Sequence, residues 1–144
     1  MFHRYVYDYK IHVITLMIIC IALIFIYNVI VRVTGTDVLS TPICDNAVFQ
    51  KIDGWSVTHL VFFMVLGILY PDHYASALVA GIAWEGVEVG IGKVEMMMDK
   101  KKTHGYGKTF WYGRGSDIIM DMIGYTIGSS FAPCPTCETL PCKR

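Results

Sequence analysis

The chain has 144 residues, of which 54% are apolar and only 17% charged, whereas an average soluble domain has about 25% charged residues. This length suits one domain, and the composition leads us to expect a single membrane domain over residues 1–144. The formal net charge is zero, so no overall field favours nucleic acid. We therefore expect membrane lipids, and no nucleic acid, as partners.

The first predicted element is a membrane-spanning helix over residues 11–31, an apolar run with almost no charge. About 20 apolar residues cross a bilayer as a helix. A secretory signal peptide has an apolar core of only about 7–15 residues and a small-residue cleavage site, so we favour a retained span. Residues 34–53 follow as a polar loop punctuated by Gly, Pro and Asp.

Three further spans are predicted at residues 54–70, 74–92 and 116–132. A basic loop with aromatic residues, 93–115, precedes the last span, and a Cys-containing tail, 133–144, follows it. Only helices and closed barrels satisfy every backbone amide in lipid, and these runs are too continuous for barrel strands. We therefore predict an all-α fold, a compact polytopic bundle of about four transmembrane helices. Small residues recur in the spans and favour close packing, with a homo-oligomer as an open alternative.

Basic residues are concentrated in the two loops at 34–53 and 93–115, and fewer lie near the termini. The bias of Lys and Arg toward cytoplasmic loops predicts that both loops are cytoplasmic. Both termini are then on the non-cytoplasmic side. The run Lys100–Lys102 is explained by this topology signal, and a specific binding role for it is the alternative.

Five ionisable residues interrupt the predicted spans, namely His59, Glu85, Glu88, Asp117 and Asp121. Ionisable groups are costly in hydrocarbon and usually mark a functional site. The second and fourth spans begin at the membrane face where the third ends, which brings all five groups to one side. The spacings of three and four residues also place each carboxylate pair on one helix face.

Carboxylates at this density cannot all stay ionised unless a cation lies between them. Ca²⁺, Mg²⁺ and Mn²⁺ favour carboxylate oxygens, so we predict a divalent cation held by Glu85, Glu88, Asp117 and Asp121. At such an ion, His59, Glu85 and Asp121 are the candidate catalytic residues, because each can move a proton.

A second set of residues is expected to bind an anionic lipid headgroup at the same face. Cationic residues attract anionic headgroups, and aromatic rings suit the interface. The candidates are Arg114, Lys108, Trp111 and Ser116.

Structural roles are the main alternatives for single residues. Asp117 could stabilise a helix start through the helix dipole, and His59 could make an ordinary interhelical hydrogen bond. Glu85 and Glu88 lie in mid-span, where two carboxylates have no such explanation.

The cysteines near the C-terminus have the spacing of redox and zinc motifs, but only three are present and no βαβ pattern surrounds them. One disulfide with one free thiol is the favoured interpretation, and palmitoylation is an alternative. These residues are Cys134, Cys137 and Cys142.

The stretch Gly81-Ile-Ala-Trp-Glu85, followed by Arg114-Gly-Ser116-Asp117, resembles the VanZ-like family of small polytopic membrane proteins. The resemblance covers about residues 54–130 and implies a fold more than a reaction. In that family, Gln and Asn often stand where this chain has Glu88 and Asp121, so this pocket is more acidic. The positions that fit the family pattern are His59, Gly81, Glu85, Arg114, Ser116, Asp117, Gly124 and Gly128.

A weaker resemblance is to eukaryotic base-exchange phosphatidylserine synthases. Glu85-x-x-Glu88 matches directly, and Trp111, Asp117 and Asp121 match in order. Those enzymes exchange phospholipid headgroups with calcium and without nucleotide. The resemblance implies that His59 acts as acid or base beside carboxylates that surround a divalent ion.

From these features we expect a divalent-metal-dependent enzyme that acts on phospholipid or lipid-linked headgroups, such as a headgroup transferase. The alternative is a non-catalytic membrane protein that binds lipid or a partner protein and alters envelope properties. A third hypothesis is a proton or ion relay, which is less favoured because no comparable ionisable residues lie in the opposite membrane half.

Overall fold

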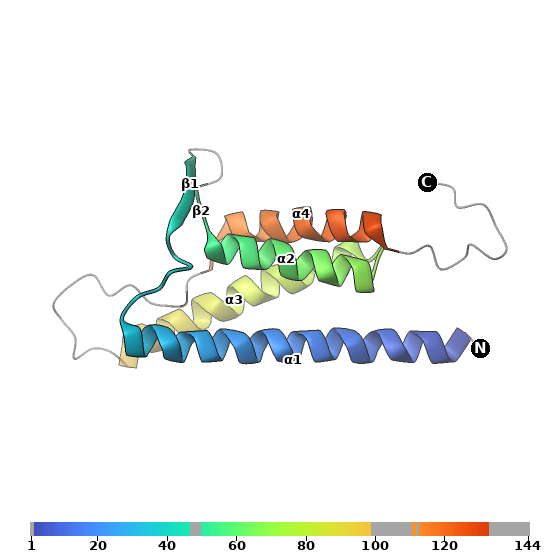
Figure 1. Ribbon diagram of the computed structural model, residues 1–144, viewed down its shortest axis with the longest axis horizontal. Helices are drawn as coiled ribbons and strands as arrows, with labels where there is room; N and C mark the ends of the chain where they lie inside the picture. The colour runs from blue at the N-terminus through green and yellow to red at the C-terminus, as the bar shows by residue number, and fades with distance from the viewer. Residues whose placement is uncertain (1, 47–49, 99–110, 112, 133–144) are drawn as a thin grey trace.

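The computed structural model describes residues 2–46, 50–98, 111 and 113–132. Within these residues it contains four helices and one short hairpin (Figure 1). The helices are α1 (Phe2–Thr34), α2 (Gly54–Leu69), α3 (Tyr74–Met98) and α4 (Gly115–Phe131). The prediction of a helical fold is confirmed for this part of the chain.

The observed helices differ from the predicted spans by more than one residue at three places, one of which is the end of α1 at Thr34, where residue 31 was predicted. α1 begins before residue 11, and α3 continues beyond residue 92 to Met98. The basic loop predicted over 93–115 therefore begins later, because residues 93–98 contain no Gly or Pro that would end the helix. Two segments, Ile11–Thr34 and Tyr74–Met97, are long and apolar enough to cross a membrane, whereas Gly54–Leu69 is a shorter apolar helix.

Part of the predicted polar loop over 34–53 forms an antiparallel hairpin of β1 (Pro42–Asn46) and β2 (Gln50–Asp53). Cys44 pairs with Ile52, and the register is irregular between Pro42 and Cys44. An isolated two-stranded hairpin is only marginally stable, so its attachment to the helices matters. That attachment is at Asp53, which ends β2 and is also the N-cap of α2.

The closest helix pair is α2 with α4, and glycines make this approach possible. A Cβ atom on Gly124 would collide with the backbone carbonyl of Leu60, and one on Gly128 would collide with that of Met64. Gly67 of α2 lies in the same way against the backbone of Tyr125 in α4. Small residues therefore set the distance between these two backbones.

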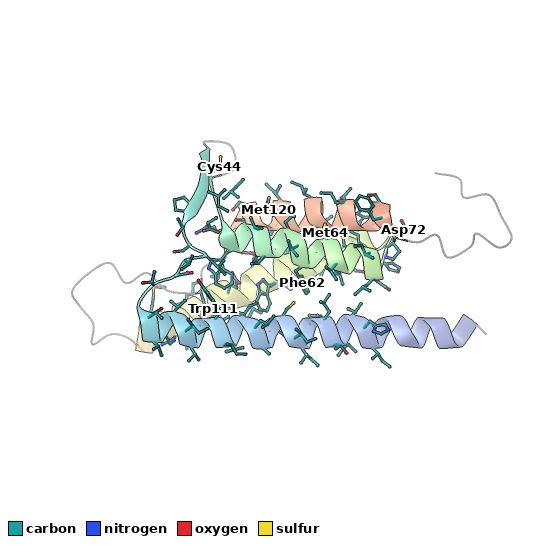
Figure 2. The ribbon with its side chains drawn as sticks, in the orientation of Figure 1. Cys44, Phe62, Met64, Asp72, Trp111 and Met120 are labelled. Atoms are coloured by element: carbon teal, nitrogen blue, oxygen red, sulfur yellow. The ribbon has the colours of Figure 1, made fainter. Side chains whose placement is uncertain are left out.

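α1 lies alongside the other helices and packs against them only near its C-terminal end (Figure 1). From residue 11 to residue 34, Asn28 is its only buried residue. Trp111 lies against α1 (Figure 2). The compact four-helix bundle that we predicted is thus a packed group of α2, α3 and α4 with α1 beside it. The contacts that attach α1 are Phe25 with Trp111, Tyr27 with Trp55, and Arg32 with Glu95.

Burial is inverted compared with a water-soluble helical domain. Among the described residues, large apolar side chains such as Ile18 and Phe131 are exposed on every helix. The buried apolar residues are Phe63, Ala77, Trp111, Tyr125 and Ala132, and the buried polar or charged ones are Asn28, Asp53, Ser56, Glu85, Ser116, Asp117 and Asp121. Charged groups are rarely buried in proteins unless they are paired, so the polar and charged side chains in this interior are unusual.

Candidate functional site

Three helices bring His59, Glu85 and Asp117 together as a buried group that could hold a metal ion. His59 belongs to α2, Glu85 to α3 and Asp117 to α4, and one ligand atom from each lies within 4.8 Å of the others. The side chains of His59 and Glu85 are 9% and 8% exposed. α2 and α4 begin, and α3 ends, at the same end of the molecule (Figure 1), as the topology argument required.

Asp117 is held by a hydrogen bond from another helix. Ser56 of α2 donates its hydroxyl hydrogen to Asp117 Oδ1 at 2.6 Å, and both residues are buried. Asp117 lies in the first turn of α4, yet no side chain caps that helix at Arg114. Asp117 therefore combines a position that the helix dipole favours with a hydrogen bond from α2.

Glu85 has one fixed carboxylate oxygen and one oxygen available to a ligand. The backbone N–H of Arg114 donates to Glu85 Oε2. Glu85 Oε1 is buried, lies 3.8 Å from His59 Nδ1, and has no hydrogen-bond partner among the described residues. The chain thus orients this carboxylate from one side only.

His59 is oriented by Asp121, which is completely buried. The two side chains are joined by a hydrogen bond of 2.9 Å between His59 Nδ1 and Asp121 Oδ1. Asp121 Oδ2 lies against Gly81 of α3, where a Cβ atom would come within 2.6 Å of it. Histidines that bind metals usually have a carboxylate or carbonyl behind them in this way.

Two of the four predicted metal-binding carboxylates lie outside the three-residue group. Asp121 contacts His59, and Glu88 accepts a hydrogen bond of 2.8 Å from Trp84 Nε1 within α3. The structure therefore supplies two carboxylates and one imidazole, where the sequence predicted four carboxylates. The other two carboxylates have different partners, because Asp121 is hydrogen-bonded to His59 and Glu88 accepts from Trp84.

The described members of the predicted headgroup-binding set each have different contacts. Arg114 Nη1 donates to Asp53 Oδ2 at 2.7 Å, and Trp111 is buried against Phe25. Ser116 is buried, and its hydroxyl has no hydrogen-bond partner within the described part of the chain. The remaining predictions, for Lys108, Lys100–Lys102, Cys134, Cys137 and Cys142, fall on residues outside the described ones.

The sequence analysis missed Asp53 and Ser56. Asp53 was placed at the end of a polar loop, but it is fully buried, and its Oδ1 accepts from the backbone N–H groups of Trp55 and Ser56 at 3.1 and 3.3 Å. An Asp immediately before an apolar helix is a familiar N-cap pattern and could have identified it. No local signal identifies the contact of Ser56 with Asp117, because it joins residues that are 61 positions apart.

The electrostatics of this region favour a bound cation. Within the described part of the chain, the carboxylates outnumber the cationic groups in contact with them, which are Arg114 and, when protonated, His59. A buried polar atom without a partner costs about 1–3 kcal/mol. Glu85 Oε1 and Asp121 Oδ2 are two such atoms among the described residues, and both are acceptors. A cation near Glu85 Oε1 would compensate the excess negative charge.

Comparison of this chain with protein-family models, with curated proteins and with solved structures finds no match.

Proposed function

We propose that this protein is a multi-pass membrane protein that binds a divalent cation and acts on the phosphate-containing headgroup of a phospholipid or lipid-linked molecule. The observation that carries the proposal is the convergence of His59, Glu85 and Asp117 from three helices. Among the described residues, the buried Oε1 atom of Glu85 has no hydrogen-bond partner, which is a second indication of a ligand.

The membrane assignment is supported by the inverted burial. Apolar side chains exposed on all sides would be unfavourable in water but are suited to lipid, which is as apolar as they are. α2 and α4 have 16 and 17 residues, so each extends about 25 Å, close to the roughly 30 Å of a hydrocarbon core. In the proposed arrangement all four helices cross the membrane, and the site lies toward the cytoplasmic face.

The donor set favours a hard divalent ion. Two carboxylates suit Mg²⁺, Ca²⁺ or Mn²⁺, and a single imidazole is also acceptable to Mn²⁺. When bound, such an ion would polarise a phosphoryl oxygen of the headgroup. In the tautomer that donates Nδ1–H to Asp121, His59 keeps a lone pair on Nε2, and a general base requires such a lone pair.

The experiment is Mn²⁺ binding to the purified protein in lipid nanodiscs, followed by electron paramagnetic resonance. We expect Glu85→Gln and Asp117→Asn each to raise the Kd by about 100-fold or more, since even the loss of a residue that hydrogen-bonds to a metal ligand costs about 10–100-fold. The control is Glu95→Gln, which changes a carboxylate of the same helix that pairs with Arg32. The proposal fails if the wild-type protein binds none of the three ions, or if Glu85→Gln binds like the wild type.

A non-catalytic role is the second candidate, and the depth of the site favours it. Each of the three ligand residues is less than one-tenth exposed, and closed metal sites are commonly structural. Headgroup exchange between phospholipid vesicles and a labelled amino alcohol separates the two roles. Turnover that stops with a chelator supports the enzyme, whereas metal binding without turnover supports the structural role.

A further inference from the structure

Asp53 makes contacts in two directions from a fully buried position. Its Oδ1 caps α2 through the backbone N–H groups of Trp55 and Ser56. Its Oδ2 accepts a hydrogen bond from the guanidinium of Arg114, whose side chain is 17% exposed. One carboxylate therefore joins the end of β2, the first turn of α2 and the residue before α4.

Arg114 connects this carboxylate to Glu85. While its side chain pairs with Asp53, its backbone N–H donates to Glu85 Oε2. The preceding residue, Gly113, lies directly on Glu85, because a Cβ atom there would come within 2.6 Å of the Glu85 carbonyl oxygen and 3.0 Å of Oε2. The position of the chain at 113–114 thus fixes which oxygen of Glu85 remains for a ligand.

A second branch connects Asp53 to Asp117. The Ser56 backbone N–H donates to Asp53, and the Ser56 hydroxyl donates to Asp117 Oδ1. Both carboxylates of the candidate metal site are therefore connected to Asp53 through one residue, Glu85 through Arg114 and Asp117 through Ser56. Neither branch contains a direct contact of Asp53 with His59 or with the other ligand residues.

We propose that Asp53 and Arg114 are positioning residues for the cation site: their ion pair holds Glu85, and the hydrogen bond of Asp53 with Ser56 supports Asp117. The positioning itself is a property of the metal-free fold, while its consequence for the cation rests on the proposed function. The pair also couples the hairpin to the site, because Asp53 ends β2. Charge-assisted hydrogen bonds of this kind are short and directional, which suits them to fixing geometry.

The variant Asp53→Asn tests the ion pair separately from the helix cap. Asn is as good an N-cap residue as Asp, so α2 should start normally while the charge facing Arg114 is removed. The matched control is Asp37→Asn, which changes another loop carboxylate that accepts hydrogen bonds from Tyr27 and Trp55 but not from Arg114.

The first measurement uses metal-free protein in nanodiscs and follows the amide proton of Arg114 by nuclear magnetic resonance. A donor to a carboxylate resonates downfield, so Glu85→Gln should shift this resonance upfield. Asp53→Asn should shift it in the same direction, while Asp37→Asn leaves it in place. An Arg114 resonance that moves in Glu85→Gln but not in Asp53→Asn overturns the inference, whether or not any metal binds.

The second measurement is the Mn²⁺ Kd of the same variants. Asp53→Asn and Arg114→Gln should each raise it by about 10-fold or more, and the double variant should raise it little further, because both remove one pair. Additive losses contradict the ion-pair mechanism. If the wild type does not bind Mn²⁺, the proposed function is contradicted. The positioning role of Asp53 and Arg114 is then tested by the amide measurement without metal.

Discussion

At the scale of single residues, His59 owes its orientation to a carboxylate that is buried behind it. Asp121 has no exposed surface, and Gly81 leaves just enough room for its second oxygen. The spacing of Asp117 and Asp121 on one helix face predicted that both would be ligands. In the structure, Asp117 forms the three-residue group with His59 and Glu85, whereas Asp121 Oδ1 is hydrogen-bonded to His59 Nδ1.

Asp121→Asn should therefore weaken cation binding less than the loss of Glu85 does. The amide is as large as the carboxylate and can still accept from His59, but it lacks the negative charge that increases the basicity of the imidazole. We expect a rise of about 10–100-fold in the Mn²⁺ Kd, measured as above. The control, Asp72→Asn, lies in an exposed turn at φ 63°, which Asn tolerates well. An effect as large as that of Glu85→Gln would identify Asp121 as a direct ligand.

At the scale of helices, backbone contact between α2 and α4 sets the distance between His59 and Asp117. Gly67, Gly124 and Gly128 lie at this contact, and the family resemblance had already singled out the last two. By contrast, a Cβ atom on Gly86 or Gly90 of α3 would meet nothing within 4 Å. The sequence does not distinguish these two groups of glycines, because a glycine lowers helix stability by about the same amount wherever it lies. The position of the neighbouring backbone shows which glycines are required.

Gly128→Ala should destabilise the protein, because the added methyl group would overlap the carbonyl oxygen of Met64. Overpacking of this kind costs about 1–3 kcal/mol. Gly90→Ala is the matched control and should be neutral or stabilising by up to about 1 kcal/mol, the difference in helix propensity. Thermal unfolding in detergent, followed by circular dichroism, measures both changes. Equal effects of the two substitutions would show that α2 and α4 are not in backbone contact.

At the scale of the whole molecule, the apolar side chains exposed on each described helix are the feature on which the proposed membrane location depends. Cys44 lies exposed on β1, within the loop that the charge bias places in the cytoplasm. It is labelled in Figure 2, at the end of the molecule where α2 begins. Its reactivity can therefore report on the orientation of the chain.

A variant that keeps Cys44 and replaces the other four cysteines by Ser provides that measurement. In intact cells, a membrane-impermeant maleimide should leave Cys44 unmodified and should label it after permeabilisation. A second variant that keeps only Cys20, inside the apolar segment of α1, should resist the reagent in both conditions. Labelling of Cys44 in intact cells would show that the chain has the opposite orientation to the one proposed.

The amino-acid sequence was enough to predict where most helices lie and which ionisable residues interrupt their apolar runs. Apolar runs of helical length and their Gly and Pro boundaries are local properties, so the bounds of α2 and α4 were predicted to within a residue. His59, Glu85 and Asp117 were recognisable for the same reason, because an ionisable group in an apolar run is visible without knowing its neighbours.

The contacts between these residues were visible only in the tertiary structure. In the structure, Asp121 and Glu88 lie outside the three-residue group. Arg114 pairs with Asp53, and Ser56 donates a hydrogen bond to Asp117. α1 lies beside the packed helices, and from residue 11 to residue 34 it contains no glycine and no buried charge. Each of these outcomes depends on side-chain directions between segments tens of residues apart, and periodicity along one helix carries no information about them.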